Sequence, residues 1–169
     1  MSLKANKKKR KFAKTPEPSV RTRSHREAKN KKSESGREKK GNIKKSSEKL
    51  IYLIHQHFAS HLHYDLRLEM NGVLKSWAVP KSPPTAKNIK RLAIQVEDHP
   101  LEYAKFHGVI PEGNYGAGKV IIWDKGKYNL IEKNSKKIIF ELHGKKLKGK
   151  YALIKTSYGN KKGWLFFKI

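Results

Sequence analysis

The stretch HFASHLHYDLRLE, residues 57–69, decides the fold class of this 169-residue chain. From Leu62 onward, apolar residues alternate with polar or charged ones, which is the period of a β-strand. The apolar set is Leu62, Tyr64, Leu66 and Leu68, and the other set is His63, Asp65, Arg67 and Glu69. If the apolar set faces a core, the other face presents an imidazole, two carboxylates and a guanidinium in a row, each about 7 Å from the next. This composition predicts the floor of an active site.

Short strand patterns continue on both sides of this stretch. Residues 50–54 (LIYLI) predict a buried strand that runs directly into it. Asn71-Gly72 separates it from residues 73–79, and Asn-Gly between two such runs is the strongest short-range hairpin signal. Further strands are expected at residues 91–97, 120–123, 127–131, 138–142, 151–155 and 164–169, with a turn at Lys125-Gly126. These short strands, almost without helix pattern, predict an all-β fold: a small antiparallel β-barrel with few short helices.

The chain is strongly basic. It holds 40 Lys+Arg against 14 Asp+Glu, which gives a net charge of +26 and a pI near 10.2. This excess implies a polyanionic partner, with nucleic acid first and an anionic membrane surface second. There is no cysteine, so any metal must bind to His, Asp or Glu. No apolar run reaches the roughly 20 residues of a membrane span, and no secretory signal is present. We expect a soluble, unprocessed monomer that is cytoplasmic, associated with the nucleoid, and not bound to membrane.

Residues 1–49 differ in composition from the rest. They hold 19 Lys+Arg and 5 Asp+Glu, a net of +14, and their larger aliphatic or aromatic residues are only Leu3, Phe12, Val20 and Ile43. Such a segment cannot bury enough apolar surface to order itself, so a flexible, partly disordered basic arm is predicted. Residues 50–169 carry 21 basic and 9 acidic groups, a net of +12, so the predicted β-barrel domain is basic as well. Within the arm, residues 10–18 could dock an extended piece onto the domain.

Two histidines and an aspartate form a candidate metal site. His63 and Asp65 share a strand face, and a short turn at Ala59-Ser60 could return His57 toward them. Two imidazoles and one carboxylate leave open coordination positions and suit Mn²⁺, Fe²⁺ or catalytic Zn²⁺. The competing ligands are His55 and His61, which composition does not exclude.

Other polar residues suggest phosphate chemistry. The fork of Arg67 matches phosphate oxygens, and an ion pair with a neighbouring carboxylate, Asp65 or Glu69, is the alternative. His99 follows a strand end, where an imidazole could transfer a proton or contact a phosphate; a lone surface histidine is the alternative. Glu97, on the polar face of its strand, could orient a metal-binding histidine.

Residues 108–118 (GVIPEGNYGAG) form a glycine-rich loop. The loop lacks the Lys-Ser/Thr of a Walker motif and the spacing of a dinucleotide fingerprint, and no helix signal follows it. We therefore predict a structural turn that shapes a cleft wall, in preference to a nucleotide site. Residues 145–150 (KKLKGK) add a second basic patch on the domain.

Four motifs resemble the 3′-phosphoesterase family: residues 57–69, 71–81, 97–103 and 108–118. That module is joined to a polymerase and a ligase in bacterial DNA ligase D of non-homologous end joining, and it also occurs as a free-standing protein, the form expected here. The resemblance covers residues 50–169 and implies a small β-barrel enzyme that uses Mn²⁺, with Co²⁺ or Zn²⁺ as alternatives. The implied activity heals 3′ ends of DNA or RNA-tipped DNA. It trims a terminal ribonucleoside and removes the 3′-phosphate to leave 3′-OH, with a separate DNA ligase and polymerase as partners.

The resemblance also implies a role for each matching residue. The matching metal ligands are His57, His63 and Asp65. The matching phosphate-contacting groups are Arg67 and His99, supported by Lys81, Tyr103 and Glu97. The arm matches the family at Arg10, Phe12, Thr15, Glu17 and Pro18, of which Arg10 and Glu17 are further candidate site residues. Lys11 stands where the family has an aspartate. Because the ribonuclease step depends on this arm, a phosphatase-only member is one alternative, and a non-catalytic basic barrel that binds nucleic acid is another.

Overall fold

The computed structural model describes residues 4, 16–18, 50–158 and 162–169. Within these residues the elements are β1 (Leu50–Phe58), β2 (Leu62–Met70), β3 (Val73–Val79), β4 (Lys90–Gln95), the 3₁₀ helix η1 (Leu101–Lys105), β5 (Gly108–Ile110), β6 (Gly118–Lys133), β7 (Lys137–His143), β8 (Lys148–Lys155) and β9 (Gly163–Lys168). No helix among the described residues has the length and apolar content that a bilayer crossing requires.

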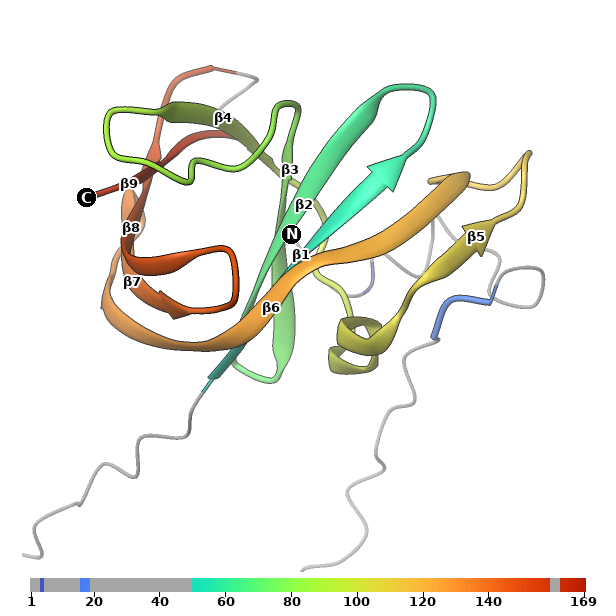
Figure 1. Ribbon diagram of the computed structural model, residues 1–169, viewed down its shortest axis with the longest axis horizontal. Coiled ribbons are helices and arrows are strands. Elements are labelled where there is room, and N and C mark those ends of the chain that lie inside the picture. Colours follow the sequence, from blue (N-terminus) through green and yellow to red (C-terminus); the bar gives the residue numbers. More distant parts are fainter. Residues whose placement is uncertain (1–3, 5–15, 19–49, 159–161) are drawn as a thin grey trace, which may run out of the picture.

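Eight of the strands close into an antiparallel barrel (Figure 1). The order around the barrel is β1-β2-β3-β4-β9-β8-β7-β6, and β6 pairs back onto β1. The short strand β5 pairs with β6 outside this ring. The predicted all-β barrel with few short helices is confirmed. The predicted disorder of the arm lies largely outside the described residues, and the division at residue 49 stays a prediction.

The hairpin between β2 and β3 has the predicted turn. Asn71 and Gly72 have φ values of 52° and 74°, and a type I′ turn requires positive φ at both central positions. Met70 therefore pairs with Val73, and the register that follows places Arg67 opposite Ser76. One local sequence choice thus fixes which side chains of the two strands are neighbours.

The predicted turn at Lys125-Gly126 is wrong. Strand β6 runs unbroken from Gly118 to Lys133, and Gly126 lies in its middle. A Cβ atom at Gly126 would stand 2.3 Å from the carbonyl oxygen of His143 on β7. A glycine is needed here because the backbones of β6 and β7 approach closely. Close backbone approach is a common reason for a glycine inside a strand.

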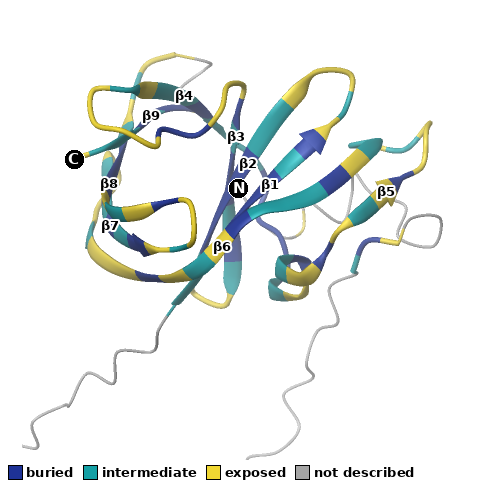
Figure 2. Cartoon of the chain, in the orientation of Figure 1, coloured by how far each residue is buried: buried dark blue, intermediate teal, exposed yellow. Residues whose placement is uncertain are grey.

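The β1–β2 hairpin is covered on both faces over part of its length. The barrel interior holds the main core, which includes Leu66, Trp77, Tyr128, Phe140, Tyr151 and Phe166. A second cluster, outside the barrel, combines Leu53, Leu74, Tyr103, Phe106, Ile110 and Val120, so η1 and β5 cover the outer face. Figure 2 shows buried residues along β1 and β2. Polar side chains on the outer face of this hairpin are therefore withdrawn from water.

The apolar face of β2 is only partly a core face. Leu66 and Leu68 are fully buried, but Leu62 is 47% exposed. The cause is the length of the hairpin, because β1, β2 and the first part of β6 extend beyond the closed part of the barrel (Figure 1). The prediction that the whole apolar set faces a core is correct for one end of the strand only.

Candidate active site

A cavity of about 240 Å³ opens on the outer face of the hairpin. Its walls include six of the predicted site residues: His57, His63, Asp65, Arg67, Glu97 and His99. Tyr115 and Gly116 of the glycine-rich loop also line it, so this loop forms a cleft wall as predicted. Residues from β1, β2 and the segments after β4 and β5 thus converge on one space.

The three predicted metal ligands lie together. The turn at residues 59–61 returns the chain so that His57 pairs with His63 across β1 and β2. One ligand atom from each of His57, His63 and Asp65 lies within 4.8 Å of the other two. The two imidazole centroids are 4.7 Å apart.

Hydrogen bonds orient the donor atoms of this group. His57 Nε2 donates to the carbonyl of Gly116 (3.0 Å), and His63 Nδ1 donates to the carbonyl of His61 (2.9 Å). Because a carbonyl only accepts, the opposite ring nitrogens, His57 Nδ1 and His63 Nε2, carry lone pairs. Burial lowers the pKa of His57, which favours this neutral form. The carboxylate Oδ1 of Asp65 is 3.7 Å from His63 Nε2. Two lone pairs and one carboxylate oxygen fit a divalent metal.

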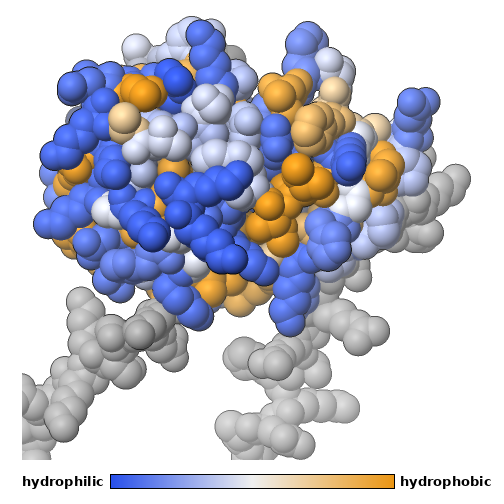
Figure 3. Space-filling model, viewed as in Figure 1, coloured by the Kyte–Doolittle hydropathy of each residue, from blue (hydrophilic) through white to orange (hydrophobic). Residues whose placement is uncertain are grey.

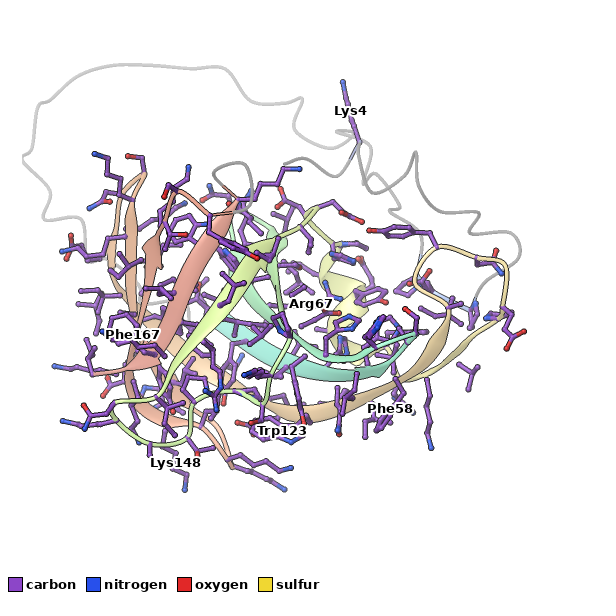
Figure 4. All side chains as sticks on the ribbon, turned by 90° about the horizontal axis from the view of Figure 1, so that it is seen from above. Lys4, Phe58, Arg67, Trp123, Lys148 and Phe167 are labelled. Carbon is purple, nitrogen blue, oxygen red and sulfur yellow. The ribbon has the colours of Figure 1, made fainter. Side chains whose placement is uncertain are left out.

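Arg67 forms the buried floor of the cavity (Figure 4). Its side chain is withdrawn from solvent, and the residue is 2% exposed. It donates to Asp65 Oδ2 (2.9 Å), Ser76 Oγ (2.8 Å), His99 Nδ1 (2.8 Å) and His55 Nδ1 (3.2 Å). A guanidinium has five N–H groups, so at most one, on Nη2, is left for a ligand. The ion pair with Asp65, which is the alternative given for Arg67 from the sequence, is present, whereas Glu69 accepts from the backbone N–H of Ile51 (2.9 Å).

His55 supports Arg67. It is fully buried, its Nε2 lies 3.0 Å from the carbonyl of Phe106, and its Nδ1 accepts from Arg67 Nε. Burial, with a contribution from Arg67, lowers the pKa of His55 to about 3, so the ring is neutral near pH 7. Both ring nitrogens are occupied by protein groups. The competing histidine His61 lies exposed in the turn, where its carbonyl accepts from His63.

His99 is also buried, which excludes the lone surface histidine considered above. The residue is 2% exposed, and two backbone hydrogen bonds to Leu74 (2.8 and 2.9 Å) hold its position. Its Nδ1 is 2.8 Å from Arg67 Nη1, 2.9 Å from the carbonyl of Glu97 and 3.2 Å from Ser76 Oγ. Sequence reasoning missed Ser76, although the Asn71-Gly72 turn, through its register, already places Ser76 opposite Arg67.

Tyr103 of η1 supports Arg67 and His99 from behind the cavity. The guanidinium carbon of Arg67 lies 4.7 Å from the centroid of the Tyr103 ring, and the imidazole centroid of His99 lies 4.8 Å from it. The phenol donates to Glu17 Oε1 (2.8 Å). Glu17 is 5% exposed, so this residue of the arm is buried against the domain next to the site.

Residues 55–155 match the family described as the DNA Ligase D 3′-phosphoesterase domain. This chain belongs to that family. The four motifs that carried the resemblance are therefore explained by membership of the phosphoesterase family.

Three relatives of this chain are named for non-homologous end joining. The LigD protein of Pseudomonas aeruginosa, a multifunctional non-homologous end joining protein, is 44% identical over 166 residues, which are 95% of this chain and 18% of the relative. LigD of Mycolicibacterium smegmatis is 46% identical over 134 residues, 73% of this chain and 17% of the relative. LigD of Mycobacterium tuberculosis H37Rv is 52% identical over 110 residues, 63% of this chain and 14% of the relative. The chain thus spans less than a fifth of the length of these relatives.

The matched region contains most of the predicted site residues, but not all of the described ones line the cavity. Lys81 lies inside the matched region, two residues after the end of β3, but it is exposed and does not line the cavity. Arg10 lies outside the described residues, as does Lys11. The catalytic and metal-binding roles of all the candidate site residues stay predictions.

Proposed function

We propose that this chain is a metal-dependent 3′-phosphoesterase that processes the 3′ ends of DNA or RNA-tipped DNA in non-homologous end joining. The observation that carries this proposal is the convergence of His57, His63 and Asp65 within 4.8 Å, beside a buried arginine. Membership of the phosphoesterase family and the names of the DNA ligase D relatives support it. The net charge of +26 suits a nucleic-acid substrate, whose backbone contacts carry little sequence information.

The proposed metal ligands are His57, His63 and Asp65, and the proposed metal is Mn²⁺, with Co²⁺ or Zn²⁺ as alternatives. When bound, such a metal supplies Lewis acidity to a phosphate oxygen. The protein's own contribution is preorganisation, since hydrogen bonds to Gly116 and His61 fix both imidazole rings before any ligand arrives.

Arg67 and His99 would bind and orient the phosphate. Arg67 presents a desolvated positive charge that stabilises the charge developing on the phosphoryl group, and it offers a single N–H in place of a bidentate fork. Because protein groups surround Nδ1 of His99, any proton that His99 gives to the leaving oxygen is carried by Nε2. Lys81 has a long, flexible side chain that would add positive charge once substrate is bound.

The test uses two oligonucleotides, one ending in a 3′-phosphate and one ending in a single ribonucleotide. With Mn²⁺ we expect both to be converted to 3′-OH ends, and with a chelator neither. Absence of product from both substrates overturns the enzyme proposal in favour of a non-catalytic nucleic-acid-binding barrel. Product from the 3′-phosphate substrate alone would limit the activity to a phosphatase. Lys11 is the reason to test for this outcome, because it stands where the family has an aspartate in the arm on which the ribonuclease step depends.

A residue-level variant tests the site itself. His63→Ala should abolish Mn²⁺-dependent turnover, because it removes one of three ligands, and should leave oligonucleotide binding unchanged. The matched control is His107→Ala, which removes an exposed histidine that does not line the cavity. Full activity in His63→Ala, or an equal loss in His107→Ala, removes His63 from the site.

A further inference from the structure

The β1–β2 hairpin has a second exposed face, on the side opposite the cavity. Phe58 and Leu62 pair across the two strands and are 43% and 47% exposed. Lys119 of β6 pairs with Phe58 from the other side. Directly paired residues of antiparallel strands project from the same face, so two apolar side chains and a lysine form one row. This row lies beyond the barrel core and is not covered by it.

An aromatic pair forms the next part of this face. The rings of Tyr64 and Trp123 meet edge to face with centroids 5.7 Å apart, and both residues are half-buried. Lys146 Nζ lies 4.4 Å from the centroid of the Trp123 ring. We call this surface the platform; its residues are Phe58, Leu62, Tyr64, Trp123, Lys119 and Lys146.

The platform and the cavity are back to back. Figure 4 shows Phe58 and Trp123 on the opposite side of the hairpin strands from Arg67. In Figure 3 a hydrophobic patch, bordered by hydrophilic residues, covers the region of β1, β2 and β6. The two strands of the hairpin separate the two sites, and the turn at residues 59–61 joins the two faces at its end; Ala59 of this turn lines the cavity.

The chemistry of the platform fits single-stranded nucleic acid. Aromatic side chains stack on bases of any sequence, and lysines beside them bind phosphates. No platform residue is acidic, and the neighbouring carboxylate, Asp124, is buried and accepts hydrogen bonds from four donors, so it does not repel a polyanion at the surface. A protein partner with an acidic surface would meet the same lysines, but the net charge of +26 over the whole chain favours a polyanion such as nucleic acid.

We propose that the platform binds the bases of a single-stranded nucleic-acid segment by stacking, while Lys119 and Lys146 contact its phosphates. The proposal rests on the proposed function only in taking nucleic acid as the polyanion. A strand whose 3′ end lies in the cavity would reach the platform by passing over the 59–61 turn. The platform therefore adds affinity without touching the reacting phosphate.

The test measures binding without turnover. The full chain is titrated, in chelator, against a labelled single-stranded oligonucleotide that ends in 3′-OH, and fluorescence anisotropy is read. The double variant Phe58→Ala/Leu62→Ser should bind about tenfold more weakly, as expected for the loss of base stacking. The control is Ile131→Ala, since Ile131 is 52% exposed on β6 but lies outside the platform, and this variant should bind like the unmodified chain. Equal affinity of the double variant and the control overturns the proposal.

Tryptophan fluorescence gives an independent measurement. Trp77 and Trp164 are 1% and 4% exposed, so Trp123 is the tryptophan that a nucleobase can reach. Oligonucleotide binding should quench the emission, and Trp123→Phe should remove the quenching. Quenching that persists in Trp123→Phe overturns the proposal.

The outcomes also separate this proposal from the proposed function. Platform-dependent binding in a chain that shows no Mn²⁺-dependent turnover supports the platform and overturns the enzyme. Mn²⁺-dependent turnover together with unchanged oligonucleotide binding by the double variant supports the enzyme and overturns the platform. A fall in molecular mass by light scattering in the double variant, with unchanged oligonucleotide affinity, would identify the platform as a self-association surface and overturn the proposal.

Discussion

Two buried aspartates of similar exposure, Asp65 on β2 and Asp124 on β6, have opposite surroundings. They are 8% and 5% exposed. Both oxygens of Asp124 are saturated: they accept from the Tyr52 hydroxyl (2.7 Å) and from the backbone N–H groups of residues 145–147 (3.1, 3.2 and 2.8 Å). Asp65 gives one oxygen to Arg67, while its other oxygen points at imidazole lone pairs. A saturated carboxylate stabilises a fold, whereas a half-saturated one beside other lone pairs is suited to bind a cation.

Asp124 and its hydrogen-bond partners stabilise the fold. The Asp124 carboxylate satisfies three backbone donors in the loop between β7 and β8, of which the N–H of Leu147 is buried and would otherwise have lost water without gaining a partner. Burial and the Asp124 carboxylate raise the pKa of Tyr52, so this phenol stays protonated and donates. Both Asp124 oxygens therefore bind protein donors and are not available to a ligand.

The largest expected effect comes from Asp65→Asn. Because it removes a proposed ligand, turnover of a 3′-phosphate oligonucleotide should fall by more than about 100-fold, the upper range for residues that only support metal ligands. The amide oxygen still accepts from Arg67, but the buried guanidinium loses the charge of its carboxylate partner, so the free energy of unfolding should also fall, by about 2 kcal/mol. Turnover with Mn²⁺ and urea unfolding measure the two quantities. Normal turnover would show that Asp65 is structural, like Asp124.

Asp124→Asn should lower stability without lowering turnover. Both oxygens of Asp124 face donors, so an amide nitrogen at either position meets N–H or O–H groups and leaves them unpaired. We expect the free energy of unfolding to fall by about 3 kcal/mol, with turnover per folded molecule unchanged. Urea unfolding and active-site titration separate these effects. Loss of turnover in fully folded protein would contradict the assignment.

Metal addition should distinguish the two carboxylates without any substrate. At Mn²⁺ concentrations of about 100 times Kd, binding to the folded state alone adds about 2.7 kcal/mol of stability. The melting temperature of the unmodified chain and of Asp124→Asn should therefore rise by several degrees, and that of Asp65→Asn should not. Excess chelator should reverse the shift. A shift that survives in Asp65→Asn would place the metal elsewhere.

The surroundings of Asp65 can be predicted from the sequence better than those of Asp124, because the neighbours of Asp65 follow from the alternation and pairing of adjacent strands. Alternation along β2 places His63, Asp65 and Arg67 on one face, and the turn at residues 59–61 adds His57. For Asp124 no local pattern reveals that its partners lie 21 to 23 residues later and 72 residues earlier in the chain. Sequence periodicity gives the face of a strand but not the elements that cover it.

The same limit explains one alternative that the sequence left open and one error. His55 competes with the three predicted ligands by residue type, and only the structure shows that its Nε2 faces a carbonyl 51 residues away, at Phe106. Gly126 was assigned to a turn because glycine marks both turns and close backbone contacts, and only the tertiary structure distinguishes them. By contrast, the Asn71-Gly72 turn was predictable, because its geometry depends on those two residues alone.

The smallest expected effect compares two tyrosines: Tyr103, which packs against the Asp65 partner Arg67, and Tyr52, which donates to Asp124. Tyr103→Phe removes the hydrogen bond to Glu17 but keeps the ring that packs against Arg67 and His99. Since one hydrogen bond contributes about 1 kcal/mol, kcat/KM should fall about fivefold if Glu17 helps to hold the site. Tyr52→Phe removes a hydrogen bond to Asp124 and should cost about 1 kcal/mol of stability with kcat/KM unchanged. Equal kcat/KM values for both variants would show that the Tyr103–Glu17 contact only anchors the arm, because a contact that positions Arg67 must alter turnover when it is lost.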